Sequence, residues 1–167
     1  MLELVRDGHA LPSAEAVAER AGVGRRTVFR LFSDMESLYR EMHAAMLMRI
    51  EHIRAIPIEG ETWRARLGCI VERRARLYEE ILPIKTAADA QRSHSVFLQE
   101  AHEETVRTLR QMLQFVLPKQ IKDDADTFEA LDAVLSIETW RRLRQDQRLS
   151  LKNARRVWEK MVAAIIA

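Results

Sequence analysis

The sequence predicts an all-α protein, and three observations support this fold class. Apolar residues recur at helical spacing along nearly the whole chain, and no stretch keeps the alternation of a β-strand. Gly and Pro are scarce, at 5 and 4 of 167 residues, so few positions interrupt a helix. Hydrophobic residues make up 47% of the chain, which suffices for a packed core. We expect about eight helices from the number of apolar stripes.

The expected helices follow one another with recognisable start and stop signals. Short helices precede residue 33, and Ser33-Asp34-Met35-Glu36 then has the form of a capping box. The helix after it ends before Pro57. Thr62 and Asp126 are expected N-caps of later helices. The later apolar segments span residues 63–81 (punctuated by Pro83), 84–92, 106–116 (stopped by Pro118), 128–143 and 151–166.

Composition and charge exclude several classes of protein. No apolar run approaches the roughly 18 residues of a membrane span, and the first residues lack the layout of a signal peptide. The single cysteine, Cys69, cannot form an internal disulfide, so we expect a cytoplasmic protein with Cys69 in its core. The 27 basic and 25 acidic residues nearly balance, so net charge by itself does not indicate a nucleic-acid partner.

Residues 13–32 form the most informative stretch, because they predict two short amphipathic helices joined by a glycine-containing turn. This arrangement is a helix-turn-helix. Gly22 suits the left-handed conformation that ends a helix, and Ala18 and Ala21 are small enough for two helices to cross closely. The expected inward contacts are Val17, Val23, Val28 and Phe32.

The second helix of this pair begins with Arg25, Arg26 and Thr27, in the turn that a recognition helix presents to the major groove. Arginine suits this position because its guanidinium binds guanine through two hydrogen bonds. Arg20 and Arg30 lie nearby in sequence and are expected to contact phosphates. Residues 1–49 have equal numbers of acidic and basic groups, so the DNA hypothesis depends on placement rather than on net charge.

The stretch also resembles a known signature. It carries Ala18, Ala21, Gly22, Val23, Thr27, Val28, Phe29, Phe32, Asp34, Glu36 and Leu38 at matching spacing. This pattern is similar to the DNA-binding signature of the TetR/AcrR family of bacterial transcriptional regulators. The resemblance implies a three-helix DNA-binding domain at residues 1–48 and a helical effector-binding and dimerisation domain at residues 49–167. It further implies a homodimer that represses from a palindromic operator until a small-molecule effector releases it.

The resemblance also indicates which residues contact DNA and where this chain departs from the pattern. The expected DNA-binding residues are Ser13, Arg25, Arg26, Thr27, Phe29 and Arg30. Phe29 stands where a tyrosine is common, and Met35 stands where a lysine is common. Only Leu2 to Asp7 precede Gly8, so the first helix is expected to be truncated. These departures leave an alternative open, namely a helical interaction protein of the same fold that has lost DNA binding.

Two further sites are expected in the larger domain. Ligand sites in helical bundles lie between helices and are mostly apolar, so an effector pocket is expected among the middle helices. Its candidate lining residues are Trp63, Tyr78, His94, Phe97 and Phe115, each with plain core packing as the alternative. The last two long segments carry more apolar surface than one core-facing stripe needs, which indicates a dimer interface. Its candidate residues are Leu131, Leu135, Trp140, Trp158, Val162 and Ile165.

Other residue clusters favour ordinary structural roles. His94 and His102 are eight positions apart rather than four, so no metal site is expected. No phosphate-binding loop or nucleophile motif occurs, and we expect neither a cofactor nor enzymatic activity. Residues 141–160 carry eight basic groups against two acidic ones. This basic run is expected to be a solvated helix face, with a second nucleic-acid contact or an acidic-ligand surface as the alternative.

Overall fold

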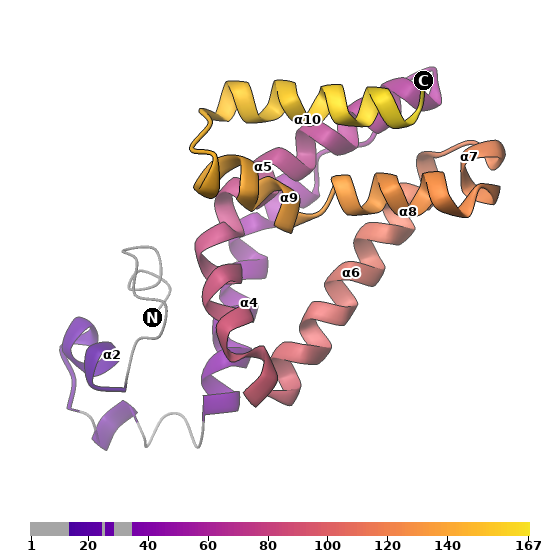
Figure 1. Ribbon diagram of the computed structural model, residues 1–167. Coiled ribbons are helices and arrows are strands. Elements are labelled where there is room, and N and C mark those ends of the chain that lie inside the picture. The colour runs from indigo at the N-terminus through magenta and orange to yellow at the C-terminus, as the bar shows by residue number, and fades with distance from the viewer. Residues whose placement is uncertain (1–13, 25, 29–34) are drawn as a thin grey trace. The chain divides into compact units, whose positions relative to one another are not determined.

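The computed structural model describes residues 14–24, 26–28 and 35–167, and it confirms the all-α class for them. The elements follow one another as shown in Figure 1. They are α2 (Ala14–Ala21), α4 (Met35–Arg54), α5 (Trp63–Gln91), the 3₁₀ turn η1 (Arg92–His94), α6 (Val96–Val116), α7 (Lys119–Asp123), α8 (Ala125–Val134), α9 (Ile137–Arg141), the π-helical turn η2 (Arg142–Asp146) and α10 (Leu151–Ile165). Residues 26–28 are helical as well. The expected first helix lies outside the described residues.

The chain packs into two compact units. The first comprises Met1–Glu51 and Glu80–Thr105, and the second comprises His52–Glu79 and Val106–Ala167. Helices α4, α5 and α6 each contribute residues to both units. The expected functional boundary at residue 48 concerns DNA binding rather than packing, so it stays a prediction.

Helix α5 continues through Pro83, so the expectation that this segment ends there was wrong. Proline has no amide hydrogen and leaves one carbonyl of the preceding turn without its helical donor. In the turn after the proline, the Thr86 hydroxyl donates to the Leu82 carbonyl over 2.8 Å. The apolar stripe also continues beyond the proline, with Ile84 and Ala87 buried in the first unit. Core packing therefore outweighs the cost of one missing hydrogen bond.

The helix starts of the second unit correct two further expectations. Thr62 is confirmed as the N-cap of α5, because its hydroxyl accepts from the Ala65 amide over 3.1 Å. Asp126 lies inside α8, and Asp124 is the N-cap instead. The single helix expected at 128–143 is divided into α8, α9 and η2. A new helix begins where the Ser136 hydroxyl accepts from the Thr139 amide, and such side-chain caps satisfy amides that have no partner within the helix.

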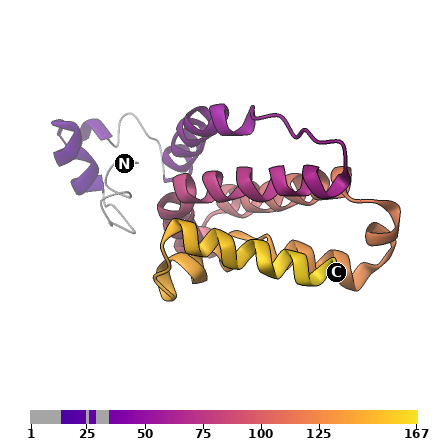
Figure 2. The same cartoon turned by 90° about the horizontal axis from the view of Figure 1, so that it is seen from above.

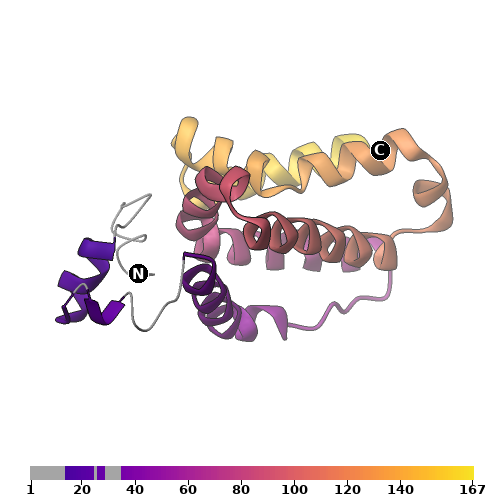
Figure 3. The ribbon, with the colours of Figure 1, turned by 90° about the horizontal axis from the view of Figure 1, so that it is seen from below.

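The core of the second unit is organised around two tryptophans. The rings of Trp140 and Trp158 lie 4.8 Å apart between centroids, and both side chains are fully buried. Trp158 belongs to the buried stripe of α10, which also includes Ala154 and Val162. Figure 3 shows α10 running beside α8 in this unit. Cys69, which was expected in the core, is only half-buried on α5.

A helix long and apolar enough to cross a membrane does not occur within the described residues.

Candidate nucleic-acid interface

Helix α2 ends in a hydrogen-bonded glycine turn. Gly22 has a φ of +66°, which is the left-handed region that side chains disfavour. Its amide donates to the Glu19 carbonyl over 3.1 Å, and the Val23 amide donates to the Ala18 carbonyl over 3.0 Å. These two bonds form a Schellman motif, which satisfies the last carbonyls of a helix. The glycine therefore acts as the sequence predicts, stopping α2 and reversing the chain.

The described part of the second helix begins at Arg26. The Gly24 carbonyl accepts from the amides of Thr27 and Val28, over 2.8 and 3.4 Å. Val17 of α2 and Val28 of the second helix are both buried, as expected for the inward faces of a helix pair. Val23 differs from its expectation, because 39% of it is exposed. It lies in the turn itself, where the backbone reversal directs it out of the contact.

Two of the expected DNA-binding residues lie among the described ones. Arg26 is exposed at the start of the second helix, and Thr27 beside it is half-buried. An exposed arginine in the first turn of a recognition helix has the position from which such helices reach base edges or phosphates. The remaining candidates, Ser13, Arg25, Phe29 and Arg30, lie outside the described residues. The DNA-contacting role of all six stays a prediction.

The start of α4, which follows the recognition helix in the chain, contacts the start of α6. A carboxylate oxygen of Glu36 accepts from the Phe97 amide over 3.2 Å. An acidic group at this helix end is favourable, since the N-terminus carries partial positive charge. The guanidinium of Arg40 lies 4.5 Å from the Phe97 ring centroid, and the His43 ring meets Phe97 edge-on at 5.6 Å. Burial lowers the pKa of His43.

The five expected pocket residues have very different environments. Phe97 is half-buried under Arg40 and His43 in the first unit. His94 is exposed, and Phe115 is 81% exposed on α6. Trp63 is half-buried beneath the guanidinium of its neighbour Arg64, and Tyr78 is buried in the core of the second unit. Their role in binding an effector therefore stays a prediction.

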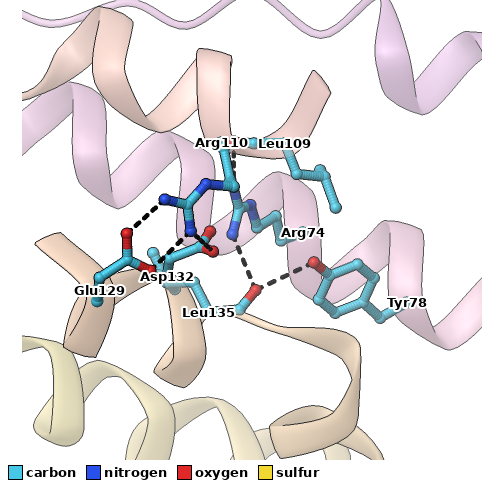
Figure 4. A network of polar contacts seen from close by, with 7 residues as sticks. All are labelled: Arg74, Tyr78, Leu109, Arg110, Glu129, Asp132 and Leu135. Atoms are coloured by element: carbon cyan, nitrogen blue, oxygen red, sulfur yellow. Dashed lines mark hydrogen bonds and ion pairs between the residues drawn. The ribbon is translucent and has the colours of Figure 1, made fainter. Parts of the chain in front are cut away.

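Tyr78 belongs to a buried polar network that sequence reasoning missed (Figure 4). Its hydroxyl donates to the Leu135 carbonyl over 3.0 Å, and Arg74 donates to the same carbonyl over 2.9 Å. Arg74 is 3% exposed and also donates to the Leu109 carbonyl of α6 over 2.6 Å. Desolvation raises the pKa of Tyr78 to about 12, against the opposing effect of Arg74. The signal in the sequence was an arginine within the apolar stripe of α5.

A second arginine in Figure 4 joins α6 to α8. Arg110 donates to both carboxylate oxygens of Glu129, over 2.9 and 2.5 Å, and to Asp132 over 2.6 Å. Bidentate pairs of this kind have a defined geometry as well as a favourable energy. Together with Arg74, this pair attaches two consecutive residues of α6 to α8 and its C-terminal cap. The network holds the three helices in fixed register.

The six expected dimer residues lie mostly in the core of a single chain. Leu131, Leu135, Trp140 and Trp158 have no exposed area, Val162 is 5% exposed, and Ile165 is half-buried. A side chain without exposed area has no surface to offer a partner. The interface on α8 and α10 stays a prediction, and the half-buried and exposed residues of the same helices are available for contact.

The basic run divides into two groups. Arg144 pairs with Glu79, and Arg155 pairs with Glu72 and Glu159. The remaining basic side chains of the run are solvated, with Arg141 half-buried and Arg142, Arg148, Lys152, Arg156 and Lys160 exposed. His, Cys, Asp and Glu side chains do not gather in a metal-sized group anywhere in the described part of the chain.

Comparison with known families agrees with the geometry of the helix pair. The family model described as bacterial regulatory proteins, tetR family, matches residues 7–42. The match spans both helices of the pair and the start of α4. No curated protein and no solved structure matches the chain. The match at the helix-turn-helix identifies this segment as one of the tetR type, and it supports a DNA-binding transcriptional regulator of that family.

Proposed function

We propose that this regulator is a homodimeric repressor, which binds a palindromic operator and is released from it by a small-molecule effector. The observation that carries the proposal is the helix pair itself. Its glycine turn is closed by two backbone hydrogen bonds, and Arg26 stands exposed in the first turn of the second helix. Two such pairs related by a two-fold axis would read successive major grooves of a palindrome.

Coupling between effector and operator requires that the effector binds two states of the protein with different affinity. Helices α4, α5 and α6 are the elements through which such a difference would act, because each contributes residues to both units. The Glu36 contact with the α6 amide supports this role, since it joins the residues after the recognition helix to a helix of the effector-binding part. Repression is therefore proposed to depend on the position of α4.

The experiment begins with the operator, which is selected from random DNA with the purified protein. Arg26→Ala is then compared with Lys119→Ala, which removes one positive charge from an exposed position outside both the helix pair and the basic run. We expect Arg26→Ala to weaken operator binding at least several fold, because one bidentate base contact contributes about 1–3 kcal/mol. Lys119→Ala should bind as the wild type does, and both variants should keep the wild-type thermal stability.

A failure of the selection would favour the other interpretation of the chain. If the protein enriches no sequence, and if its weak binding to any duplex is unchanged by Arg26→Ala, the repressor proposal falls. A helical interaction protein that has lost DNA binding would then be the better account. Met35, which is exposed at the start of α4 in place of the usual lysine, is compatible with that outcome.

A further inference from the structure

The connector between α4 and α5, residues 55–62, runs back along α5 (Figure 2). Three side chains of α5 hydrogen-bond to its backbone. Each of the three lies about one helical turn from the next and donates to a carbonyl of the connector. The pairs are Arg66 with Gly60 at 3.0 Å, the Cys69 thiol with Glu59 at 3.1 Å, and Arg73 with Ile56 at 3.0 Å. All of these residues belong to the second unit.

Arg73 uses only part of its guanidinium in this attachment. Nη1 donates to the Ile56 carbonyl and, over 3.5 Å, to the carbonyl of Arg54, the last residue of α4. Nη2 faces the thioether sulfur of Met112 on α6 over 3.1 Å. A thioether is a weak acceptor. Among the described residues Nε has no acceptor, so the edge formed by Nε and Nη2 has a single weak contact.

This edge is one of the two through which arginine binds a carboxylate, because its two N–H groups point in parallel toward two oxygens, as those of Arg144 do toward Glu79. The Met112 sulfur occupies the place of one of those oxygens. No carboxylate in the described part of the chain pairs with Arg73. The site therefore presents the arginine half of a bidentate ion pair, and the weakly accepting Met112 sulfur lies where a carboxylate oxygen would bind.

The charges around the site favour an anion as well. Desolvation lowers the pKa of Arg73, and the neighbouring guanidiniums of Arg74 and Arg54 lower it further. Buried Arg74 donates to the carbonyls of Leu109 and Leu135. Like charges at close range are destabilising, and a bound anion would reduce that cost. Arg73 contacts the Ile56 carbonyl and the Met112 sulfur, and both of these residues are apolar and half-buried.

We propose that the Nε and Nη2 edge of Arg73 binds the carboxylate of a small organic acid, whose apolar part packs beside Met112 and Ile56. Binding replaces the contact between Arg73 and the Met112 sulfur. The inference rests on the proposed function, since it names the chemical class of the effector. It also explains how such an effector would act, because Arg73 simultaneously holds the carbonyls that follow α4.

The test uses the full-length protein and matched pairs of probes, in which a negatively charged carboxylate is compared with its neutral amide. The methionine methyl groups are labelled with carbon-13, and the Met112 signal is assigned with Met112→Leu. Hexanoate, benzoate and their neutral amides, hexanamide and benzamide, are titrated to millimolar concentration, with inorganic phosphate in parallel. We expect at least one carboxylate to shift the Met112 signal saturably and its amide to leave the signal unchanged.

Two variants locate the binding group. Arg73→Gln keeps a donor for the connector but loses the charged fork, and its affinity for the carboxylate should fall about tenfold or more. Arg73→Lys keeps the charge without the fork and should bind at intermediate strength. Arg66→Gln is the matched control, because Arg66 fastens the same connector at Gly60, and it should bind as the wild type does.

The results that overturn the proposal are specific. Equal shifts with a carboxylate and its amide, a response to phosphate alone, or wild-type affinity in a folded Arg73→Gln variant would each refute it. Operator affinity is measured in the same samples. A carboxylate that binds at Arg73 without changing operator affinity would leave the site standing and contradict the proposed effector-controlled repression. Release of the operator by compounds whose binding does not depend on Arg73 would support effector-controlled repression and contradict the proposed site.

Discussion

Glu79 at the centre of the second unit offers the sharpest test of how α5 is joined to the C-terminal helices. One of its carboxylate oxygens accepts from the Trp140 indole over 2.8 Å and from Arg144 Nε over 2.7 Å. The other oxygen accepts from Arg144 Nη2 over 2.9 Å. Arg144 also donates to the Leu149 carbonyl in the turn before α10. The change Glu79→Gln removes the charge and one acceptor while keeping the shape.

The size of the effect follows from these contacts. A hydrogen bond to a charged group contributes about 1.5–3 kcal/mol, and the Gln side chain replaces one acceptor of the bidentate pair with a second donor. The side chains of Glu79 and Arg144 are 29% and 25% exposed, so water screens part of the interaction. The indole retains an acceptor in the variant. We therefore expect the free energy of unfolding to fall by about 2 kcal/mol at neutral pH, and Tm by about 4–8 °C.

The pKa of Glu79 determines how the stability difference should change with pH. Desolvation raises the pKa of Glu79, but the hydrogen bonds from Arg144 and Trp140 outweigh it and hold the pKa below the ordinary value of 4.5. A carboxyl with a depressed folded-state pKa stabilises the protein above its unfolded pKa, and that contribution is lost as pH falls through the folded pKa. The difference in free energy of unfolding between the wild type and Glu79→Gln should therefore decrease below about pH 4.5, since only the wild type loses this contribution.

Urea unfolding measured at neutral and acidic pH decides the matter. Glu138→Gln is the control, because it neutralises an exposed acid of α9 that is not bonded to Arg144. Its stability should stay within about 0.5 kcal/mol of the wild type, as is usual for surface changes. If Glu79→Gln matches this control at neutral pH, or if its stability difference from the wild type grows in acid, Glu79 does not join α5 to the C-terminal helices in this way.

Three further predictions concern other parts of the chain. Gly22→Ala should raise amide exchange rates in residues 17–28 roughly fivefold, since a left-handed alanine costs about 1 kcal/mol. Gly24 lacks a positive φ and has equally open space around it, so Gly24→Ala should leave these rates unchanged. Tyr78→Phe should cost about 1 kcal/mol in urea unfolding, because Arg74 still satisfies the shared carbonyl, and a loss above about 3 kcal/mol would contradict this account. Ile165→Glu should dissociate or unfold the proposed dimer and abolish operator binding; a wild-type mass near 19 kDa in sedimentation equilibrium at micromolar concentration would contradict the dimer itself.

The helix pair was largely predictable because its information is local. The amides of Gly22 and Val23 end α2 by donating to carbonyls three and five residues earlier, and these bonds depend only on backbone conformation. The buried positions Val17 and Val28 follow from helical spacing in the same short stretch. Thr62 was identified as a cap for the same reason, since its partner is three residues away.

Tertiary packing decided the features that local rules misjudged. Pro83 usually ends a helix, yet α5 continues because Ile84 and Ala87 bury their side chains beyond it. Trp158 of α10 packs at a tilt against Trp140 inside one chain, so its burial is satisfied there, and the interface on α8 and α10 stays a prediction. Periodicity shows which side chains avoid water, but it does not show whether a helix of the same chain or a second copy of the protein covers them.

The all-α class, the helix-turn-helix and its likeness to the tetR family are all encoded locally, because each depends on the spacing of residues along the chain. The roles of Arg73 and Arg74, two adjacent arginines on one helix, follow only from how the helices pack. One donates to carbonyls of the α4 connector and the other to carbonyls of α6 and the α8 cap, up to 61 positions away. The role of a buried charge depends on the hydrogen-bond acceptors around it, and these acceptors come together only when the helices pack.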